Sequence, residues 1–228
     1  MKHIVIGDIH GRDTWQRVNT KLYEKIIFLG DYVDSYTLSD FTILENLKKI
    51  LTFKKKNPEK VILLLGNHDV HYLHYPRFGC SGFRTTMQPE LSALLRRNAD
   101  LFQVAYQKDK YLFTHAGVTN SWYGEILRSP KLLEICEEGE NLADQLNLLE
   151  RSTFRGTLYD VGMERGGYGY GGPLWADMKE TFTDMLHGYH QIVGHTNVEE
   201  IRTVSYTGRS ITYADVLTTK DQFHELDI

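Results

Sequence analysis

The chain has 228 residues, 41% of them hydrophobic and 25% charged, so it can bury a full core as one large domain and is not disordered. Its formal net charge of −4 and its pI near 6.2 exclude a protein-wide basic surface for a nucleic-acid backbone. It has no signal-peptide pattern and no stretch near the roughly 20 apolar residues of a membrane span, so we expect a cytoplasmic protein without a membrane partner.

The first part of the chain predicts alternating strands and helices. Short β-rich apolar runs cover residues 2–6, 25–29 and 61–65, and each leads into a glycine. Between the second and third runs, Ser39 is a candidate helix cap and Pro58 closes the helical pattern. Strand, helix and strand in this order favour parallel pairing, which brings the residues after each strand to one edge of the sheet.

The rest of the chain predicts helices followed by strands. Residues 88–98 and 119–150 have helical composition, and a hairpin is expected from 101–107 and 110–115 with its turn near Asp109. Further strands are expected near 190–194, 201–206, 210–217 and 222–227. We therefore predict one α/β domain over 1–228, with two mixed sheets packed as a sandwich, flanking helices and a helical insert around 119–165.

Five predicted strand ends carry polar residues next to glycine. The segments are Gly7-Asp8-Ile9-His10-Gly11, Gly30-Asp31-Tyr32-Val33-Asp34, Gly66-Asn67-His68-Asp69, Thr114-His115-Ala116-Gly117 and Val193-Gly194-His195-Thr196. A lone Asp and His after a strand are more often a helix cap and a surface polar group. Recurrence at five strand ends instead favours a shared site at one sheet edge.

These five motifs resemble the calcineurin-like metallophosphoesterases, and within them the Ser/Thr protein phosphatase type. The resemblance rests on GDIHG, GDYVDS, GNHD, THAG and GHT, and it spans residues 7–196. Asn197 stands where many members of the wider superfamily have a second histidine, which favours the protein-phosphatase-like branch. The resemblance implies a phosphoesterase whose dinuclear metal site lies at the strand ends.

By this resemblance six side chains would hold two divalent metal ions. Asp8 and His10 would hold the first ion, Asp31 would bridge both, and the second would be completed by Asn67, His115 and His195. Mixed oxygen and nitrogen ligation suits manganese, iron or zinc better than calcium, and we expect manganese.

Two cations about 3.5 to 4 Å apart lower the pKa of a bridging water, so that hydroxide attacks phosphorus in line. The resemblance makes His68 the general acid for the leaving group, with Asp34 orienting its imidazole. Taken alone, His68 more often makes a structural hydrogen bond and Asp34 more often stabilises a turn, but the array of motifs favours the catalytic roles. His71 and His74 follow the third motif and are left unassigned.

The chain departs from the phosphatase pattern where that pattern places phosphate-binding arginines. Ser35 follows Asp34 and Leu65 precedes the third motif, and Asp177 stands where bacterial and phage relatives often have an arginine. Loss of bidentate arginine contacts weakens binding of a phosphate dianion. The replacement candidates are Arg12, Arg77, Arg84, Arg155 and Arg165.

The glycine-rich segment 166–172, with Tyr168 and Tyr170, is either an aromatic rim of the substrate site or a flexible connector. The expected substrate is a phosphorylated Ser/Thr protein or a small phosphorylated molecule. The alternatives are a dinucleoside polyphosphate hydrolase or phosphodiesterase and, from another class, a non-catalytic metal-binding module. No strong nucleic-acid binding is expected, and the sequence assigns no oligomeric state.

Overall fold

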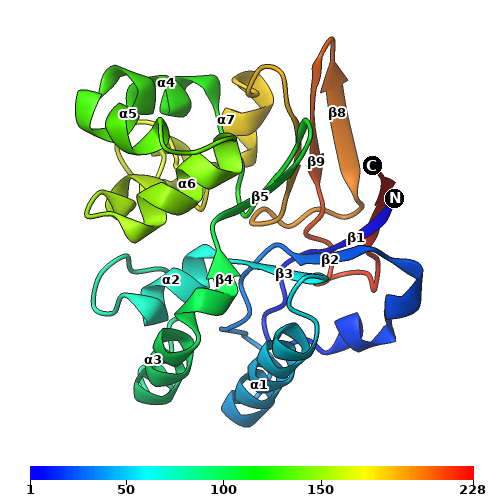
Figure 1. Ribbon diagram of the computed structural model, residues 1–228. Helices are drawn as coiled ribbons and strands as arrows, with labels where there is room; N and C mark the ends of the chain where they lie inside the picture. The colour runs from blue at the N-terminus through cyan, green and yellow to red at the C-terminus, as the bar shows by residue number, and fades with distance from the viewer. The chain divides into compact units, whose positions relative to one another are not determined.

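Two five-stranded sheets organise the chain, which a computed structural model describes over residues 1–228. One sheet belongs to a first unit, formed by Met1–Gln103 together with Val216–Ile228, and the other to a second unit, Val104–Asp215 (Figure 1). The mixed sheets and flanking helices confirm the predicted α/β class. The packing of the sheets as a sandwich and the single-domain organisation stay predictions.

The sheet of the first unit has the order β10-β1-β2-β3-β4. Neighbours from β1 to β4 pair in parallel, as predicted from the strand and helix order, and β10 pairs with β1 in the antiparallel direction. The two central apolar runs are almost wholly buried because a parallel strand is covered on both faces. The strands are β1 (Lys2–Ile6), β2 (Lys25–Phe28), β3 (Val61–Leu64), β4 (Phe102–Gln103) and β10 (His224–Asp227).

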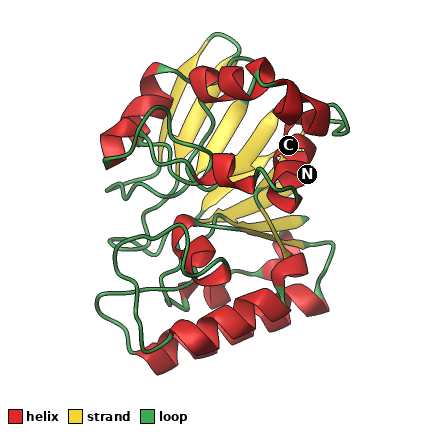
Figure 2. Cartoon of the chain, turned by 90° about the vertical axis from the view of Figure 1, so that its left-hand side faces the viewer, coloured by secondary structure: helices red, strands yellow, loops and turns green.

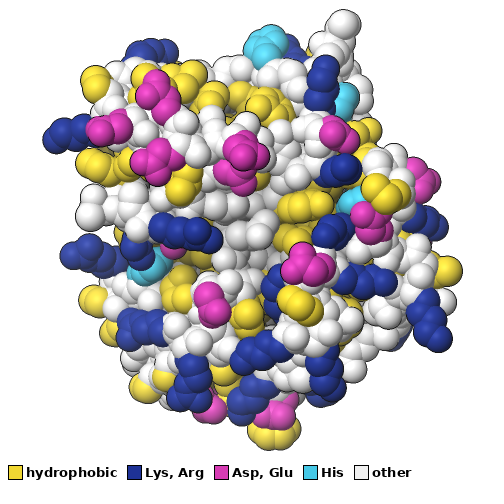
Figure 3. Space-filling view, viewed as in Figure 1, with side chains coloured by type: hydrophobic (Ala, Val, Ile, Leu, Met, Phe, Trp, Pro, Cys, Tyr) yellow, Lys and Arg dark blue, Asp and Glu magenta, His cyan; other side chains and the backbone are white.

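Helix α1 (Asp40–Lys56) forms where the sequence predicts it. The Ser39 hydroxyl accepts the Thr42 backbone N–H, which satisfies one of the donors left free in the first turn. Lysines fill the last turn, where they interact favourably with the negative end of the helix dipole. Lys and Arg side chains are dense over α1 and over α3 (Gln88–Arg97) on the face shown in Figure 3. The buried face is Ile43, Leu44, Asn46, Leu47, Ile50 and Leu51.

The remaining helices of the first unit lie with α1 on one face of its sheet (Figure 2). Successive parallel strands joined by right-handed connections in the same direction place their helices on the same side. The helices are α2 (Asn67–Leu73) and α3 (Gln88–Arg97), with short 3-10 turns at Thr14–Arg17, Thr20–Leu22 and Ala99–Leu101. Because β1, β2 and β3 are parallel, the loops that follow them and carry the first three motifs leave the sheet at one edge.

The sheet of the second unit has the order β5-β6-β7-β9-β8. The predicted hairpin is present between β5 and β6, and Asp109 in its turn has a left-handed φ of 52°. Strands β6, β7 and β9 are parallel neighbours, so the fourth and fifth motifs leave this sheet at the same edge. The strands are β5 (Ala105–Lys108), β6 (Tyr111–Thr114), β7 (His190–Val193), β8 (Arg202–Tyr206) and β9 (Arg209–Tyr213).

Two sequence expectations need correction here. The predicted strand 101–107 is two strands, because Phe102–Gln103 pairs with β3 while Ala105–Lys108 pairs with β6. The five motif-bearing strand ends also do not share one sheet edge. Three belong to the first sheet and two to the second, because sheet membership is decided by long-range pairing that periodicity does not record.

Helices cover one face of the second sheet (Figure 1). Those within the predicted helical stretch are α4 (Asn120–Arg128), α5 (Pro130–Cys136), α6 (Leu142–Arg151) and the 3-10 turns Arg155–Tyr159 and Met163–Arg165, followed by α7 (Met178–Thr183). A cluster under α7 is formed by Met185, Val193, Ile211 and Tyr213. None of the helices in the chain has the length and apolar character needed to cross a membrane.

Candidate functional site

Left-handed backbone marks the motif loops. Six non-glycine residues in the chain have positive φ, and four of them belong to the predicted site: His10 (43°), Asp31 (52°), Asp34 (58°) and His195 (63°). This conformation costs an L-residue roughly 1–2 kcal/mol, so it persists only where surrounding contacts enforce it. Its concentration in three separate loops points to side chains held in place for function.

The loops after β1 and β2 are joined by backbone hydrogen bonds beyond the strands. The His10 N–H donates to the Asp31 carbonyl at 2.7 Å, and the Gly11 N–H donates to Tyr32 at 3.1 Å. The His10 Nδ1 lies 2.9 Å from both the Val33 and Asp34 carbonyl oxygens. Since a carbonyl only accepts, Nδ1 carries the proton, and the neutral ring presents the Nε2 lone pair.

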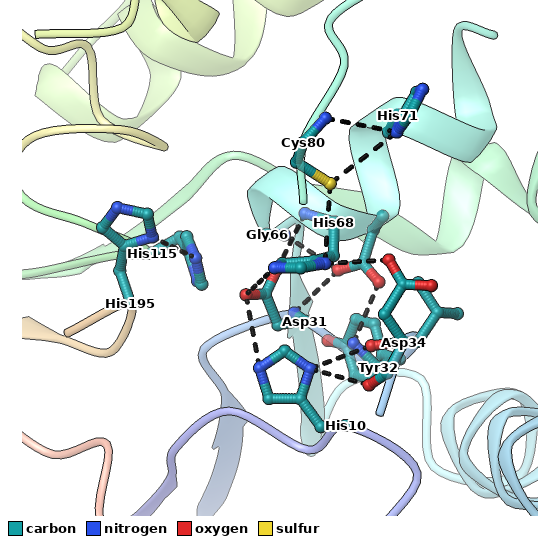
Figure 4. A network of polar contacts seen from close by, with 12 residues as sticks. His10, Asp31, Tyr32, Asp34, Gly66, His68, His71, Cys80, His115 and His195 are labelled. Atoms are coloured by element: carbon teal, nitrogen blue, oxygen red, sulfur yellow. Dashed lines mark hydrogen bonds and ion pairs between the residues drawn. The ribbon is translucent and has the colours of Figure 1, made fainter. Parts of the chain in front are cut away.

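The His10 Nε2 lone pair faces Asp31 with the geometry of two ligands on one ion. Nε2 and Asp31 Oδ2 are 3.7 Å apart, and the donor atoms of His10, Asp31 and His68 all lie within 4.8 Å of one another (Figure 4). Metal–nitrogen and metal–oxygen bonds are about 2.0–2.2 Å long, so ligands of one ion lie roughly 3–4 Å apart. His10 and Asp31 therefore fit two ligands of a divalent metal.

Asp8 and Asn67 belong to the same unit and are almost completely buried. Asp8 follows β1 and is 1% exposed, while Asn67 begins α2 and is 3% exposed. A carboxylate is very rarely buried unless it is paired or coordinates a metal, so the burial of Asp8 agrees with a ligand role.

His68 and Asp34 form a hydrogen-bonded pair in the first unit. His68 Nδ1 donates to Asp34 Oδ2 at 2.8 Å, and the Tyr72 hydroxyl donates to the other Asp34 oxygen at 2.6 Å. The His68 backbone N–H donates to Asp31 Oδ1 at 3.0 Å. Burial lowers the pKa of His68, but the Asp31 charge and the Asp34 hydrogen bond outweigh it and raise that pKa to about 12. The pair is thus set to hold a proton on the imidazole.

Asp69 positions the second and third motif loops, a role that the sequence analysis did not assign. Its two carboxylate oxygens accept the backbone N–H groups of Asp31, Tyr32 and Gly66 at 2.8–2.9 Å. Asp69 is fully buried, and a buried carboxylate with three backbone donors is well compensated. The available signal was the acid at the end of GNHD, two residues after the proposed ligand Asn67.

Glycines 30 and 66 allow these two loops to approach closely. A Cβ at Gly30 would lie 2.5 Å from the Gly66 nitrogen, and a Cβ at Gly66 would lie 2.1 Å from Asp31 Oδ1. No side chain fits at either position without displacing backbone or the Asp31 carboxylate. The glycine before each motif is therefore a steric requirement of the site.

The second unit holds its own pair of histidines. His115 follows β6 and His195 follows β7, and His195 Nδ1 lies 3.2 Å from His115 Nε2. Two nitrogens bound about 2.1 Å from one ion at right or tetrahedral angles are about 3.0–3.4 Å apart, so the pair fits a shared metal. His115 is fully buried, and the Trp175 ring packs edge-on against His195 with centroids 5.6 Å apart. Trp175 thus packs against the last motif.

Two of the candidate arginines, Arg84 and Arg165, have different partners in the structure. The Arg84 guanidinium is committed to Asp40 and to the Ser35 and Leu38 carbonyls, so it holds the 35–40 loop. Arg165 instead pairs with Asp177 through Nε at 2.7 Å and donates to the Thr196 hydroxyl at 2.9 Å. Arg165 therefore lies beside the His195 loop and brings a guanidinium to the place where Asp177 has replaced an arginine.

The glycine-rich segment 166–172 is ordered by backbone contacts within the second unit. The Gly172 N–H donates to Asp160 at 2.8 Å, and the Gly171 N–H donates to the Glu180 carboxylate at 3.1 Å. A Cβ at Gly172 would meet the Leu158 carbonyl oxygen at 2.6 Å, so close packing requires glycine there. The Tyr168 side chain is 98% exposed at the tip of this segment.

Comparison with known proteins finds phosphatases among the proteins to which this chain is similar. A PP2A-like serine/threonine-protein phosphatase from Candida albicans is 36% identical over 70 residues, which cover 28% of this chain and 16% of that protein. The chain thus spans a small part of that relative's length. The cold-active protein-tyrosine phosphatase of a psychrophilic Shewanella species has a similar structure, with TM-score 0.53, 15% identity and coverage of 92% of this chain and 70% of that one.

A mutant of a cold-active protein tyrosine phosphatase gives a TM-score of 0.54, with 14% identity over the same shares of the two chains. At this identity the likeness concerns the fold alone. The family described as calcineurin-like phosphoesterase matches residues 1–199, which include all five motifs. The chain therefore belongs to the calcineurin-like phosphoesterase family.

Proposed function

We propose that the chain is a metal-dependent phosphomonoesterase acting on a phosphorylated Ser/Thr protein or a small phosphorylated molecule. The observation that carries the proposal is the His10 imidazole, which two backbone carbonyls orient so that Nε2 faces Asp31 at 3.7 Å. Such fixation of a ring through its other nitrogen is typical of metal-binding histidines. Membership of the phosphoesterase family supports the reaction class.

The proposed metal ligands are the six residues named from the motifs: Asp8, His10, Asp31, Asn67, His115 and His195. When bound, a pair of divalent cations lowers the pKa of water and neutralises phosphoryl charge. Oxygen donors with three imidazoles suit manganese, with iron or zinc as alternatives, and we propose manganese in a cytoplasmic enzyme.

His68 and Asp34 would provide the proton that the leaving group needs. An alkoxide is a poor leaving group, so its departure is assisted when an imidazolium donates a proton to it. Asp34 accepts from Nδ1, which orients the ring, stabilises its charge and leaves the Nε2 proton to be donated. Tyr72 holds Asp34 in turn, so the orientation does not depend on a single contact.

Substrate preference would be set by residues around these loops. Arg165 is the candidate for binding phosphate oxygens because its guanidinium already lies at Thr196, next to His195. The PP2A-like relative is named as a serine/threonine phosphatase, which supports a phosphoprotein as the first substrate to test. The exposed Tyr168 ring supports a nucleotide-containing substrate as the second, because aromatic rings stack on bases.

Turnover by manganese-loaded protein tests the proposal. The substrates are para-nitrophenyl phosphate, its bis ester, a phosphoserine peptide and diadenosine tetraphosphate, with bound metal counted in the same samples. We expect the monoesters to be hydrolysed much faster than the bis ester. Faster cleavage of the bis ester or of the dinucleotide would replace the monoesterase proposal with the corresponding alternative. Two bound metals without turnover of any substrate would favour a binding module.

A further inference from the structure

A second group of metal-ligating side chains surrounds Cys80 in the first unit. Cys80 Sγ lies 3.5 Å from His68 Nδ1 and 3.7 Å from His71 Nδ1, while His68 Nδ1 lies 2.8 Å from Asp34 Oδ2 (Figure 4). The donor atoms of Asp34, His68 and Cys80 are all within 4.8 Å of one another. The cluster lies on the Nδ1 side of the His68 ring, whereas Nε2 faces Asp31 at 4.0 Å.

These separations match a tetrahedral zinc site. With Zn–S near 2.3 Å and Zn–N near 2.05 Å, a tetrahedral angle places sulfur and nitrogen about 3.5–3.6 Å apart. The observed distance of 3.5 Å between Cys80 Sγ and His68 Nδ1 agrees with this value. A nitrogen and a carboxylate oxygen on the same ion would be about 3.3 Å apart, so the 2.8 Å His68–Asp34 contact would open by about half an ångström.

The His71 ring lies beside this cluster and holds the Cys80 backbone. Its Nδ1 accepts the Cys80 backbone N–H at 3.3 Å, so this nitrogen is the unprotonated one. Burial lowers the pKa of His71, which favours the neutral ring that accepts this hydrogen bond. The ring is held by stacking on Phe83, with centroids 4.1 Å apart. His71 therefore positions Cys80 next to the cluster without being one of its ligands.

The loop that carries Cys80 is anchored at its far end. The Arg84 N–H donates to the Tyr72 hydroxyl at 2.9 Å, and its guanidinium binds the Ser35 and Leu38 carbonyls. Tyr72 also holds Asp34, so the loop and the acid pair share one support. This arrangement keeps the thiol beside the imidazole rather than in solvent.

We propose that Asp34, His68 and Cys80 bind a zinc ion that inhibits the enzyme. Binding displaces the thiol proton of Cys80 and the Nδ1 proton of His68, and both are released to solvent. Sulfur makes this site selective for thiophilic ions such as Zn²⁺ over Mn²⁺, whereas the six motif ligands offer only oxygen and nitrogen. The inhibitory effect rests on the proposed function, because the zinc ion would engage the two residues that deliver the proton.

The absorption spectrum of bound cobalt(II) detects the site independently of enzyme activity. Protein first loaded with manganese is kept in a phosphine reductant and titrated with Co²⁺, and a thiolate-to-cobalt charge-transfer band is followed in the near ultraviolet. We expect the band in the wild type and in Cys136→Ala, which removes the other cysteine, and its loss in Cys80→Ser. A band that persists in Cys80→Ser, or is absent from the wild type, would overturn the site.

Zinc titration of turnover then tests inhibition. Manganese-loaded wild type should lose activity as one zinc binds, and Cys80→Ser should need at least tenfold more zinc for the same fractional loss. Equal zinc sensitivity in both proteins would overturn the inhibitory role. Failure of the proposed function would appear as absence of turnover without zinc while the cobalt band remains, so the two results are distinguishable.

Discussion

Asp34 Oδ2 accepts a hydrogen bond from His68 Nδ1 at 2.8 Å, although the two residues are 34 positions apart in the sequence. The contact joins the end of the second motif to the start of α2, and Tyr72 holds the other Asp34 oxygen. Because Asp34 also adopts a left-handed φ of 58°, both its backbone and its side chain are constrained to present one oxygen to the imidazole. This relationship connects the fold to the proposed proton transfer.

Replacing Asp34 with asparagine should impair proton donation more than substrate binding. The amide presents no charge to stabilise the imidazolium, so kcat should fall about 10²–10⁴-fold on an alkyl phosphate with little change in KM. Para-nitrophenyl phosphate should lose less, because its leaving group needs no proton. Steady-state kinetics on both substrates measure the difference. An equal loss on both would contradict a role in leaving-group protonation.

Substitutions at Asp31 and at His68 should have different effects on metal binding and on turnover. Asp31→Asn should lower the metal content of the purified protein and abolish activity, since a bridging ligand would lose its charge. His68→Ala should retain the metals and lose mainly kcat. Metal analysis alongside kinetics distinguishes the two variants. Unchanged kcat in His68→Ala would remove its acid role, and full metal content in Asp31→Asn would remove the bridging role.

The raised pKa of His68 predicts a pH-dependent contribution to the stability of the metal-free protein. The folded-state pKa is about 12 against an unfolded value of 6.5, so the contribution is fully present below pH 6.5 and declines as pH rises toward 12. The difference in free energy of unfolding between wild type and His68→Gln should therefore shrink between pH 6.5 and 9, by up to about 1.4 kcal/mol per pH unit. Urea unfolding in the presence of a chelator measures it, and a constant difference would contradict the shift.

Asp69→Asn should destabilise the first unit although it replaces none of the proposed metal ligands. The carboxylate accepts three backbone N–H groups, and an amide offers one oxygen while turning its NH₂ toward at least one of these donors. A buried donor left unsatisfied costs about 1–3 kcal/mol. Thermal unfolding of the metal-free variant should show a lower Tm than the wild type. An unchanged Tm would mean that these donors find other partners.

Arg165→Gln should raise KM for phosphomonoesters. The guanidinium at Thr196 is the candidate replacement for the missing arginines, and its loss should cost about tenfold in KM with metal content unchanged. Arg128→Gln provides a matched control, because Arg128 is an exposed arginine in the last turn of α4. Equal KM values in the two variants would mean that Arg165 does not bind the substrate phosphate and only pairs with Asp177.

Local sequence determined much of the fold and the family. The cap at Ser39, the apolar face of α1 and the apolar runs of β1 to β3 are short-range signals, and the structure follows them closely. The motif pattern placed glycine and a polar residue after each strand, and the steric conflict at Gly30 and Gly66 explains why that order recurs. Such information survives in the sequence because each requirement concerns neighbouring residues.

Tertiary structure alone decided which distant residues meet. Division of five motif strands between two sheets depends on pairing across long separations, which periodicity does not encode. The same holds for the three donors gathered by Asp69, for the commitment of Arg84 to the 35–40 loop and for Cys80, which a loop returns to His68. The contacts of a side chain depend on which distant segments of the backbone lie beside it, and only the folded structure determines that.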